Sequence, residues 1–183
     1  MWLWREFYSV STNFFELFAL ENTFKLDLNK LEVNFRAIQS ASHPDRFVSA
    51  SASEKIKSMQ TATLANEAYL TLKNPANRAK YCLQLQNIDA VAQTNTSMPA
   101  DFLMQQMDWR ETIEDAKQAK NIVALENLLI EMKLASHVLQ ASLIDLIDVK
   151  KDYHGATSDT RKLIFIDKVS ADIHQVIEYL DSD

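Results

Sequence analysis

The tripeptide His43-Pro44-Asp45 offers the residue types best suited to chemistry at a protein surface. An imidazole can donate or accept a hydrogen bond, and a carboxylate can make a charge-assisted contact. Pro44 restricts the backbone between them. The tripeptide lies where two amphipathic helical patterns must turn back on each other, so its residues are expected at the exposed end of a helical hairpin. We interpret it as a contact for another protein, although a helix stop followed by a solvated loop would require only Pro44.

The remaining candidates for catalysis form no recognisable arrangement. The four histidines are scattered at His43, His137, His154 and His174, without the spacing of a metal pair. Cys82 is the only cysteine, which excludes an internal disulfide and a cysteine zinc site and favours a reducing compartment. We expect it to be a small buried hydrophobe. With one glycine, the chain can contain neither of the Gly-rich nucleotide-binding motifs G-x-x-x-x-G-K-[ST] and G-x-G-x-x-G. We therefore expect a protein that is not an enzyme and uses no cofactor and no metal.

The composition predicts an all-α fold. The chain has 183 residues, of which 47% are hydrophobic, and only one glycine and three prolines from which to build hairpin turns. No apolar run approaches the roughly 20 residues of a membrane span. The amino end lacks the positively charged start and apolar run of a targeting segment. We expect a cytoplasmic protein without a membrane partner.

The negative charge is unevenly distributed. Acidic and basic residues cancel over residues 1–74, so the net charge of −6 lies entirely in residues 75–183. Binding to nucleic acid requires clustered basic residues. The sequence therefore argues against a nucleic-acid partner.

Helix signals place the tripeptide between two long helices. Capping residues mark three helix starts: Asn13 or Thr12 for a short first helix, Asp27 for the second, and Ser51 or Ser53 for the third. The second helix should bury Leu31, Phe35 and Ile38 and end near Ser42, because the residue before a proline disfavours helical geometry. The third helix should continue to about Leu72. The result is a helical hairpin with the tripeptide at its tip.

A polar segment divides the chain. A fourth helix should begin at Asn74-Pro75, with Asn74 as its N-cap and Pro75 in its first turn. After Leu85 the sequence becomes polar. We predict a first domain over residues 1–86, a linker over 87–98 and a second domain over 99–183.

The second domain is expected to be an antiparallel three-helix bundle. Its first helix should run from near Pro99 to about Ala119, its second should begin near Asn121, and its third should follow a reversal around Gly155. The second and third helices carry apolar or small residues in alternating steps of three and four: Leu125, Leu129, Met132, Ser136, Leu139, Leu143 and Leu146, then Leu163, Ile166, Ser170, Ile173, Ile177 and Leu180. Such spacing is typical of helices packed lengthwise.

The first domain resembles the J-domain family of co-chaperones over about residues 13–82. The resemblance rests on the tripeptide together with the block Asn66-Glu67-Ala68-Tyr69-Leu70-Thr71-Leu72-Lys73-Asn74-Pro75 and the following Arg78-Ala79-Lys80-Tyr81. It implies that the domain docks on a DnaK-type chaperone and stimulates its ATP hydrolysis. The chaperone-binding residues that it implies are His43, Pro44, Asp45, Arg46 and Arg36.

The second domain is similar to the carboxy-terminal domain of the HscB-type co-chaperones of iron–sulfur cluster assembly. The similar segments run from Phe102 to Glu111 and from Arg161 to Lys168, and the resemblance then covers about residues 13–181. It implies a bundle that binds an IscU-type scaffold protein and delivers it to a dedicated HscA-like chaperone. The scaffold-binding residues that it implies are Leu103, Met104, Met107, Asp108, Arg110, Glu111 and Phe165. Without the cysteine pairs near the start of eukaryotic relatives, the chain is expected to be of the bacterial type.

A helical wheel of the first bundle helix separates some of these scaffold-binding residues from expected core residues, and it does so without using the resemblance. At about 100° per residue, Met104, Met107, Asp108 and Glu111 fall on one side of their helix. The opposite side carries Phe102, Trp109 and Ile113 and should face the core. Methionines edged by acids suit an adaptable protein-binding surface. In the alternative interpretation, Met104 and Met107 fill the interior of the bundle. For Phe165 the alternative is a core position, because a lone aromatic residue is more often buried than a contact.

Two functional hypotheses follow from these patterns. The leading one is a co-chaperone with one domain for the chaperone and one for the scaffold. The alternative is a general helical J-domain adaptor or interaction module unrelated to iron–sulfur assembly. Only Lys30 and Arg36 are basic in the second helix, so electrostatic steering toward an acidic chaperone should be weak. This favours one specialised chaperone partner.

Overall fold

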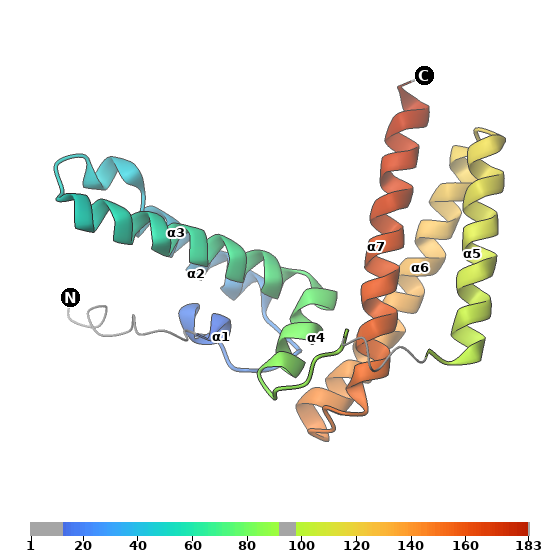
Figure 1. Ribbon diagram of the computed structural model, residues 1–183, viewed down its shortest axis with the longest axis horizontal. Coiled ribbons are helices and arrows are strands. Elements are labelled where there is room, and N and C mark those ends of the chain that lie inside the picture. Colours follow the sequence, from blue (N-terminus) through green and yellow to red (C-terminus); the bar gives the residue numbers. More distant parts are fainter. Residues whose placement is uncertain (1–12, 92–97, 183) are drawn as a thin grey trace. The chain divides into compact units, whose positions relative to one another are not determined.

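A computed structural model describes residues 13–91 and 98–182, and all regular structure within these ranges is helical (Figure 1). The predicted all-α class is confirmed. Contacts divide the chain into two compact units, residues 1–78 and 79–183, so the division falls before the predicted boundary at residue 86. Half of the predicted linker (residues 92–97), the candidate cap Thr12 and the tryptophans Trp2 and Trp4 lie outside the described residues.

The first unit is built around a helical hairpin. Its elements are the short helix α1 (Phe14–Leu17), α2 (Leu28–Ala41), the 3₁₀ turn η1 (Pro44–Phe47), α3 (Ala52–Lys73) and the start of α4 (Pro75–Gln84). Helices α2 and α3 lie side by side and antiparallel, and η1 joins them at the end of the hairpin farthest from α4 (Figure 1). The predicted hairpin is therefore present, with a helical turn where a plain loop was expected.

Side-chain caps explain where these helices begin. The Asn13 carboxamide accepts a hydrogen bond from the Phe15 backbone, and the Asp27 carboxylate accepts two from the start of α2. Ser51 and Glu54 form a reciprocal capping box at the start of α3. Of the two serines considered, Ser51 is therefore the cap. These bonds satisfy backbone N–H groups that lack partners within the helix.

Aromatic and aliphatic side chains fill the core of the first unit. The fully buried residues are Phe15, Phe18, Phe24, Leu31, Ala65, Ala68, Leu72 and Ala76. Arg78 is also buried, and its guanidinium donates to the backbone carbonyls of Phe24 and Leu72. It also stacks 5.0 Å from the centroid of the Phe24 ring. These contacts fix the loop after α1 against the end of α3 and give the buried guanidinium hydrogen-bond acceptors.

The second unit contains the remainder of α4 and an antiparallel bundle. The bundle helices are α5 (Ala100–Gln118), α6 (Ile122–Leu143) and α7 (Ala156–Asp181), and α6 passes into the π-helical turn η2 (Ile144–Val149). Figure 1 shows α5, α6 and α7 side by side. Their shared core consists of Phe102, Trp109, Ala116, Leu125, Leu128, Met132, Ile166 and Ile173. Cys82 is buried, as predicted.

The π turn changes which residues of the second bundle helix face inward. The sequence predicts a regular seam through Leu143 and Leu146, but Ile147 is buried while Leu146 is only half-buried. Hydrogen bonding to the fifth preceding residue, as from Lys150 to the Asp145 carbonyl, adds one residue to the turn. The inward position therefore moves from Leu146 to Ile147.

Left-handed backbone positions are occupied by residues other than glycine. Ala19, Asn87, Lys120 and Lys151 have φ between 49° and 59°, whereas Gly155 has a right-handed φ of −59°. The reversal before α7 therefore uses Lys151, and the only glycine does not supply the conformational freedom for it. No helix within the described ranges is long and apolar enough to cross a membrane.

Candidate protein-binding surfaces

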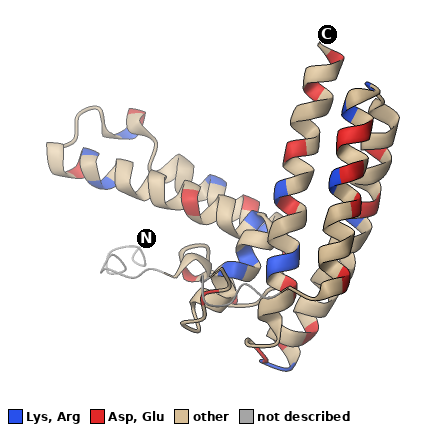
Figure 2. Ribbon diagram, turned by 45° about the vertical axis from the view of Figure 1, so that its right-hand side comes forward, with Lys and Arg blue, Asp and Glu red and all other residues tan. Residues whose placement is uncertain are grey.

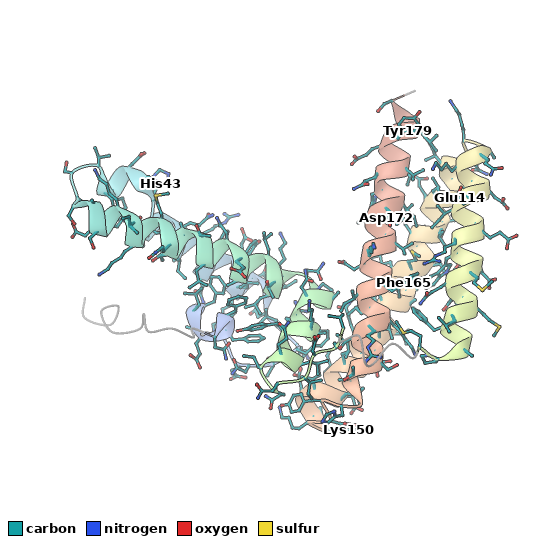
Figure 3. The ribbon with its side chains drawn as sticks, in the orientation of Figure 1. His43, Glu114, Lys150, Phe165, Asp172 and Tyr179 are labelled. Carbon is teal, nitrogen blue, oxygen red and sulfur yellow. The ribbon has the colours of Figure 1, made fainter. Side chains whose placement is uncertain are left out.

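The first candidate surface is the tip, defined as residues 43–46, and all four residues are exposed. Figure 3 labels the first of them, His43. His43 is the N-cap of η1: its Nδ1 accepts a hydrogen bond from the Asp45 backbone N–H at 3.3 Å. An accepting Nδ1 places the ring proton on Nε2, which leaves that N–H free to donate outward. The Asp45 side chain is 87% exposed, 3.6 Å from His43 Nδ1. The tip thus presents one ring donor and one carboxylate.

Buried hydrogen bonds hold the tip on the hairpin. Ser42, which ends α2, is buried and its hydroxyl donates to the Ile38 carbonyl at 2.8 Å. From α3, the hydroxyl of buried Ser58 donates to the Ser42 carbonyl at 2.7 Å. Two amides, Gln39 and Asn66, form another bond between the helices at 3.1 Å. The backbone leading into the tripeptide is therefore fixed.

An open groove of about 660 Å³ adjoins the tip. It is larger than a second groove of about 560 Å³, which lies on the bundle. The residues that line the groove at the tip come from α2, the tip and α3: Arg36, Gln39, Ser40, Ser42, His43, Pro44, Arg46 and Ala62. The structure therefore brings Arg36 to the same groove as three of the four tip residues. Asp45 is exposed outside this lining.

Arg36 is oriented by a carboxylate one helical turn earlier. Its Nε lies 2.8 Å from Glu32 Oε1, and the Tyr69 hydroxyl donates to the other carboxylate oxygen. The Tyr69 hydrogen bond and Arg36 together lower the pKa of Glu32 below its ordinary value. Tyr69 itself stacks on Phe35, with ring centroids 4.0 Å apart. A packed aromatic on α3 thus sets the position of an exposed base on α2.

The second candidate surface is the α5 face, defined as Leu103, Met104, Met107, Asp108, Arg110 and Glu111. All six residues are exposed, and Met104 and Met107 reach 62% and 70%. Phe102 and Trp109 on the opposite side are buried, and Ile113 packs on the core. The predicted division of this helix is confirmed, and the alternative in which the methionines fill the bundle is wrong.

Phe165 occupies a different environment from the other predicted scaffold-binding residues. It lies on α7 on the side toward α5 (Figure 3) and is half-buried. Its ring stacks on Trp109 with centroids 6.3 Å apart and meets the edge of Phe102 at 5.7 Å. Phe165 therefore contributes to the bundle packing, and its role as a contact stays a prediction.

A groove beside the α5 face adds residues from the other bundle helices. Met104 and Asp108 line it together with Val138 of α6 and Lys162 of α7. Lys162 also lies 5.7 Å from the centroid of the Phe102 ring. The α5 face therefore continues into a concave, partly apolar surface.

Acidic residues are frequent on α5, where Figure 2 shows them in red. The helix carries five acids and two bases, among them Asp108, Arg110 and Glu111 of the α5 face. Among the described residues, no group of three His, Cys, Asp or Glu side chains could hold a metal ion. The exposed side chains of the two surfaces can supply hydrogen bonds, ion pairs and apolar contacts.

Several supporting residues were missed by sequence reasoning. Glu32 could have been found, because a glutamate four residues before an arginine is a recognised helix pair. Ser58 gives no local signal, since its partner Ser42 lies on another helix. The same applies to Glu131, which accepts a 2.8 Å hydrogen bond from the Trp109 indole and so fixes the buried side of α5.

Sequence comparisons connect the chain with named proteins along most of its length. A family model described as the HSCB C-terminal oligomerisation domain matches residues 98–174. A Co-chaperone protein HscB homolog from Burkholderia mallei is 46% identical over 173 residues, covering 94% of this chain and 98% of that protein. A homolog of the same name from Paraburkholderia phymatum is 44% identical over 174 residues, covering 95% and 99%.

Solved structures share this fold. Chaperone HscB from Vibrio cholerae superposes with a TM-score of 0.78 at 34% identity, covering 92% of this chain and 99% of that one. Human co-chaperone protein HscB gives a TM-score of 0.80 at 25% identity, covering 91% and 83%. The family model includes the α5 face within its matched residues.

Proposed function

Because this chain belongs to the HscB co-chaperone family, we propose that it links a DnaK-type chaperone of the HscA-like kind to an IscU-type scaffold protein during iron–sulfur cluster assembly. The first unit stimulates ATP hydrolysis by the chaperone. The second unit holds the scaffold. The protein itself catalyses no covalent step in this proposal, and its place of action is the bacterial cytoplasm.

The observation that carries the proposal is the presence of two exposed surfaces, one on each unit. The tip presents His43 and Asp45 on a backbone fixed by buried hydrogen bonds. The α5 face presents Met104 and Met107 beside acids and a base. Neither surface contains a nucleophile paired with a base, and both suit protein contacts.

Chaperone docking would use the tip together with its groove. The Asp45 carboxylate would pair with a base on the chaperone, and His43 Nε2–H would donate to a carbonyl or carboxylate. Arg36 and Arg46 border the same groove and supply positive charge. Because few other bases lie on α2, specificity would depend on these close contacts more than on long-range steering.

Scaffold binding would use the α5 face. Methionine side chains adapt to an apolar partner surface, and Asp108, Arg110 and Glu111 would fix its orientation through ion pairs at the edge. A scaffold held here would reach the chaperone on the same protein that triggers ATP hydrolysis, which raises its effective concentration at the chaperone.

Single-turnover ATP hydrolysis by an HscA-like chaperone tests the proposal. We expect this protein to accelerate hydrolysis and the scaffold to increase the effect. Calorimetry of this protein with the scaffold, in the absence of the chaperone, measures scaffold binding separately. A general helical adaptor would leave hydrolysis by every DnaK-type chaperone unchanged, and that result would reject the proposal.

A further inference from the structure

Arg36 is an exposed base with only one side of its guanidinium engaged. Its Nε–H donates to Glu32 Oε1 at 2.8 Å, while the side chain stays 75% exposed. Within the described part of the chain, neither terminal nitrogen of Arg36 has a hydrogen-bond partner. A guanidinium binds a carboxylate best through two parallel N–H groups. The end of Arg36 that carries both terminal nitrogens is therefore available to a carboxylate of another protein.

Glu32 is held from the opposite helix of the hairpin. The Tyr69 hydroxyl of α3 donates to Glu32 Oε2, the oxygen that Arg36 does not contact. An exposed ion pair between residues four apart on one helix contributes little order by itself. Here the carboxylate also bonds to a half-buried side chain on α3. The packing of the two helices therefore sets its position.

Ring packing fixes Tyr69 in turn. Its ring stacks on Phe35 with centroids 4.0 Å apart and planes inclined by 9°. Phe35 meets Phe18 edge to face at 6.4 Å, and Phe18 is 1% exposed. A continuous series of contacts therefore runs from the core of the first unit to the exposed guanidinium of Arg36.

The second base of the groove at the tip is held less firmly. Arg46 Nη1 lies 3.5 Å from the Ser40 carbonyl, at the outer limit of a hydrogen bond. Both arginines line the groove, whereas Glu32 and Tyr69 do not. Glu32 and Tyr69 would therefore affect a partner in the groove through Arg36.

We propose that Glu32 and Tyr69 are positioning residues for chaperone docking, which hold Arg36 beside the tip so that its terminal nitrogens pair with a carboxylate of the chaperone. This role rests on the proposed chaperone contact, and neither residue is among the chaperone-binding residues that the family resemblance implies. A long side chain loses rotamer freedom when it binds. Hydrogen bonds that already restrict Arg36 reduce that loss, and their removal should weaken docking about two- to tenfold.

Titration of this protein into single-turnover ATP hydrolysis by an HscA-like chaperone tests the role. Tyr69→Phe removes the hydroxyl and keeps the ring that stacks on Phe35. The concentration for half-maximal stimulation should rise about two- to tenfold, and saturating amounts should restore the rate. Glu32→Ala should raise it similarly. Tyr179→Phe is the matched control, because Tyr179 is 64% exposed on α7, and it should leave that concentration unchanged.

An Arg36→Ala background separates positioning from a general effect on the fold. Tyr69→Phe should have no further effect there, because the side chain to be positioned is gone. An equal effect with and without Arg36 would overturn the positioning role. So would an unchanged or lower half-maximal concentration in Tyr69→Phe. Circular dichroism should show the same helix content in all variants.

The same titration distinguishes failure of the positioning role from failure of the proposed function. If Arg36→Ala stimulated like the unmodified protein, Arg36 would not contact the chaperone. The positioning role would then be rejected, while stimulation by the first unit would stand. An unmodified protein that stimulated no DnaK-type chaperone would reject the proposed function and the positioning role together.

Discussion

The hydroxyl of Ser58 on α3 donates a 2.7 Å hydrogen bond to the backbone carbonyl of Ser42, the residue immediately before the tripeptide. Both serines are buried. The bond connects the end of α2 to the second turn of α3, so the exposed tip has a buried point of attachment.

Ser58→Ala should weaken this attachment. The variant leaves the buried Ser42 carbonyl without its donor, which should cost about 1–2 kcal/mol in the free energy of unfolding. Urea denaturation of the full chain measures the loss. Ser53→Ala is the matched control at an exposed position of α3 and should change stability by less than about 0.5 kcal/mol. Equal stability of the two variants would show that the bond contributes nothing.

Asp45→Ala should separate chaperone stimulation from folding. The side chain is almost fully exposed, so circular dichroism should be unchanged. Loss of a charge-assisted contact should reduce the stimulation of single-turnover ATP hydrolysis at least about tenfold. Glu67→Ala removes an exposed acid of α3 and should retain full stimulation. If Asp45→Ala stimulated like the unmodified protein, the tip would not be the chaperone contact.

Replacement of both methionines of the α5 face should affect the scaffold alone. Met104→Ala/Met107→Ala should weaken scaffold binding at least about tenfold in calorimetry, because the apolar contact is lost. Stimulation of the chaperone without scaffold should persist. Met59→Ala, at a 66% exposed position of α3, is the control and should bind scaffold normally. Unchanged affinity of the double variant would place the scaffold elsewhere.

Stability of the first unit should depend on pH through Glu32. The Tyr69 hydrogen bond, followed by Arg36, lowers the pKa of Glu32 in the folded state. The ionised carboxylate therefore stabilises the fold above its unfolded pKa, and this contribution disappears as the pH falls through the folded pKa. Glu32→Gln should be less stable than the unmodified protein at about pH 7, and the difference should shrink toward about pH 3.

Urea midpoints at the two pH values measure this change. In a Tyr69→Phe background, which removes the main hydrogen-bond donor, Glu32→Gln should show a smaller pH-dependent difference. An equally large difference in that background would mean that Tyr69 does not perturb the Glu32 pKa.

Lys120→Gly should stabilise the second unit. Lys120 follows α5 at φ 49°, where a side chain is strained, and the Asn121 N–H closes the turn on the Ala116 carbonyl at 2.8 Å. Glycine should raise the free energy of unfolding by about 0.5–1 kcal/mol. Lys120→Ala removes the same long side chain but retains Cβ, and it should give no such gain. Equal denaturation midpoints for the two variants would contradict the backbone explanation.

Local signals explain why much of the fold could be predicted. Asp27, Ser51 and Asn121 start helices because their side chains accept hydrogen bonds from backbone groups two or three residues away. Pro44 ends α2 through its effect on the preceding residue. The outward side of α5 follows from helical periodicity alone. In each case, residues close in the sequence supply all the information.

The sequence by itself therefore determined the helices, the exposed position of the tripeptide and the two sides of α5. Tertiary structure alone decided that Ser58 anchors Ser42, that Tyr69 orients Arg36 through Glu32, and that Phe165 packs on Trp109. It also moved the inward position from Leu146 to Ile147. Capping and periodicity act within one or two helical turns, whereas these contacts depend on how separate helices pack, which no single segment specifies.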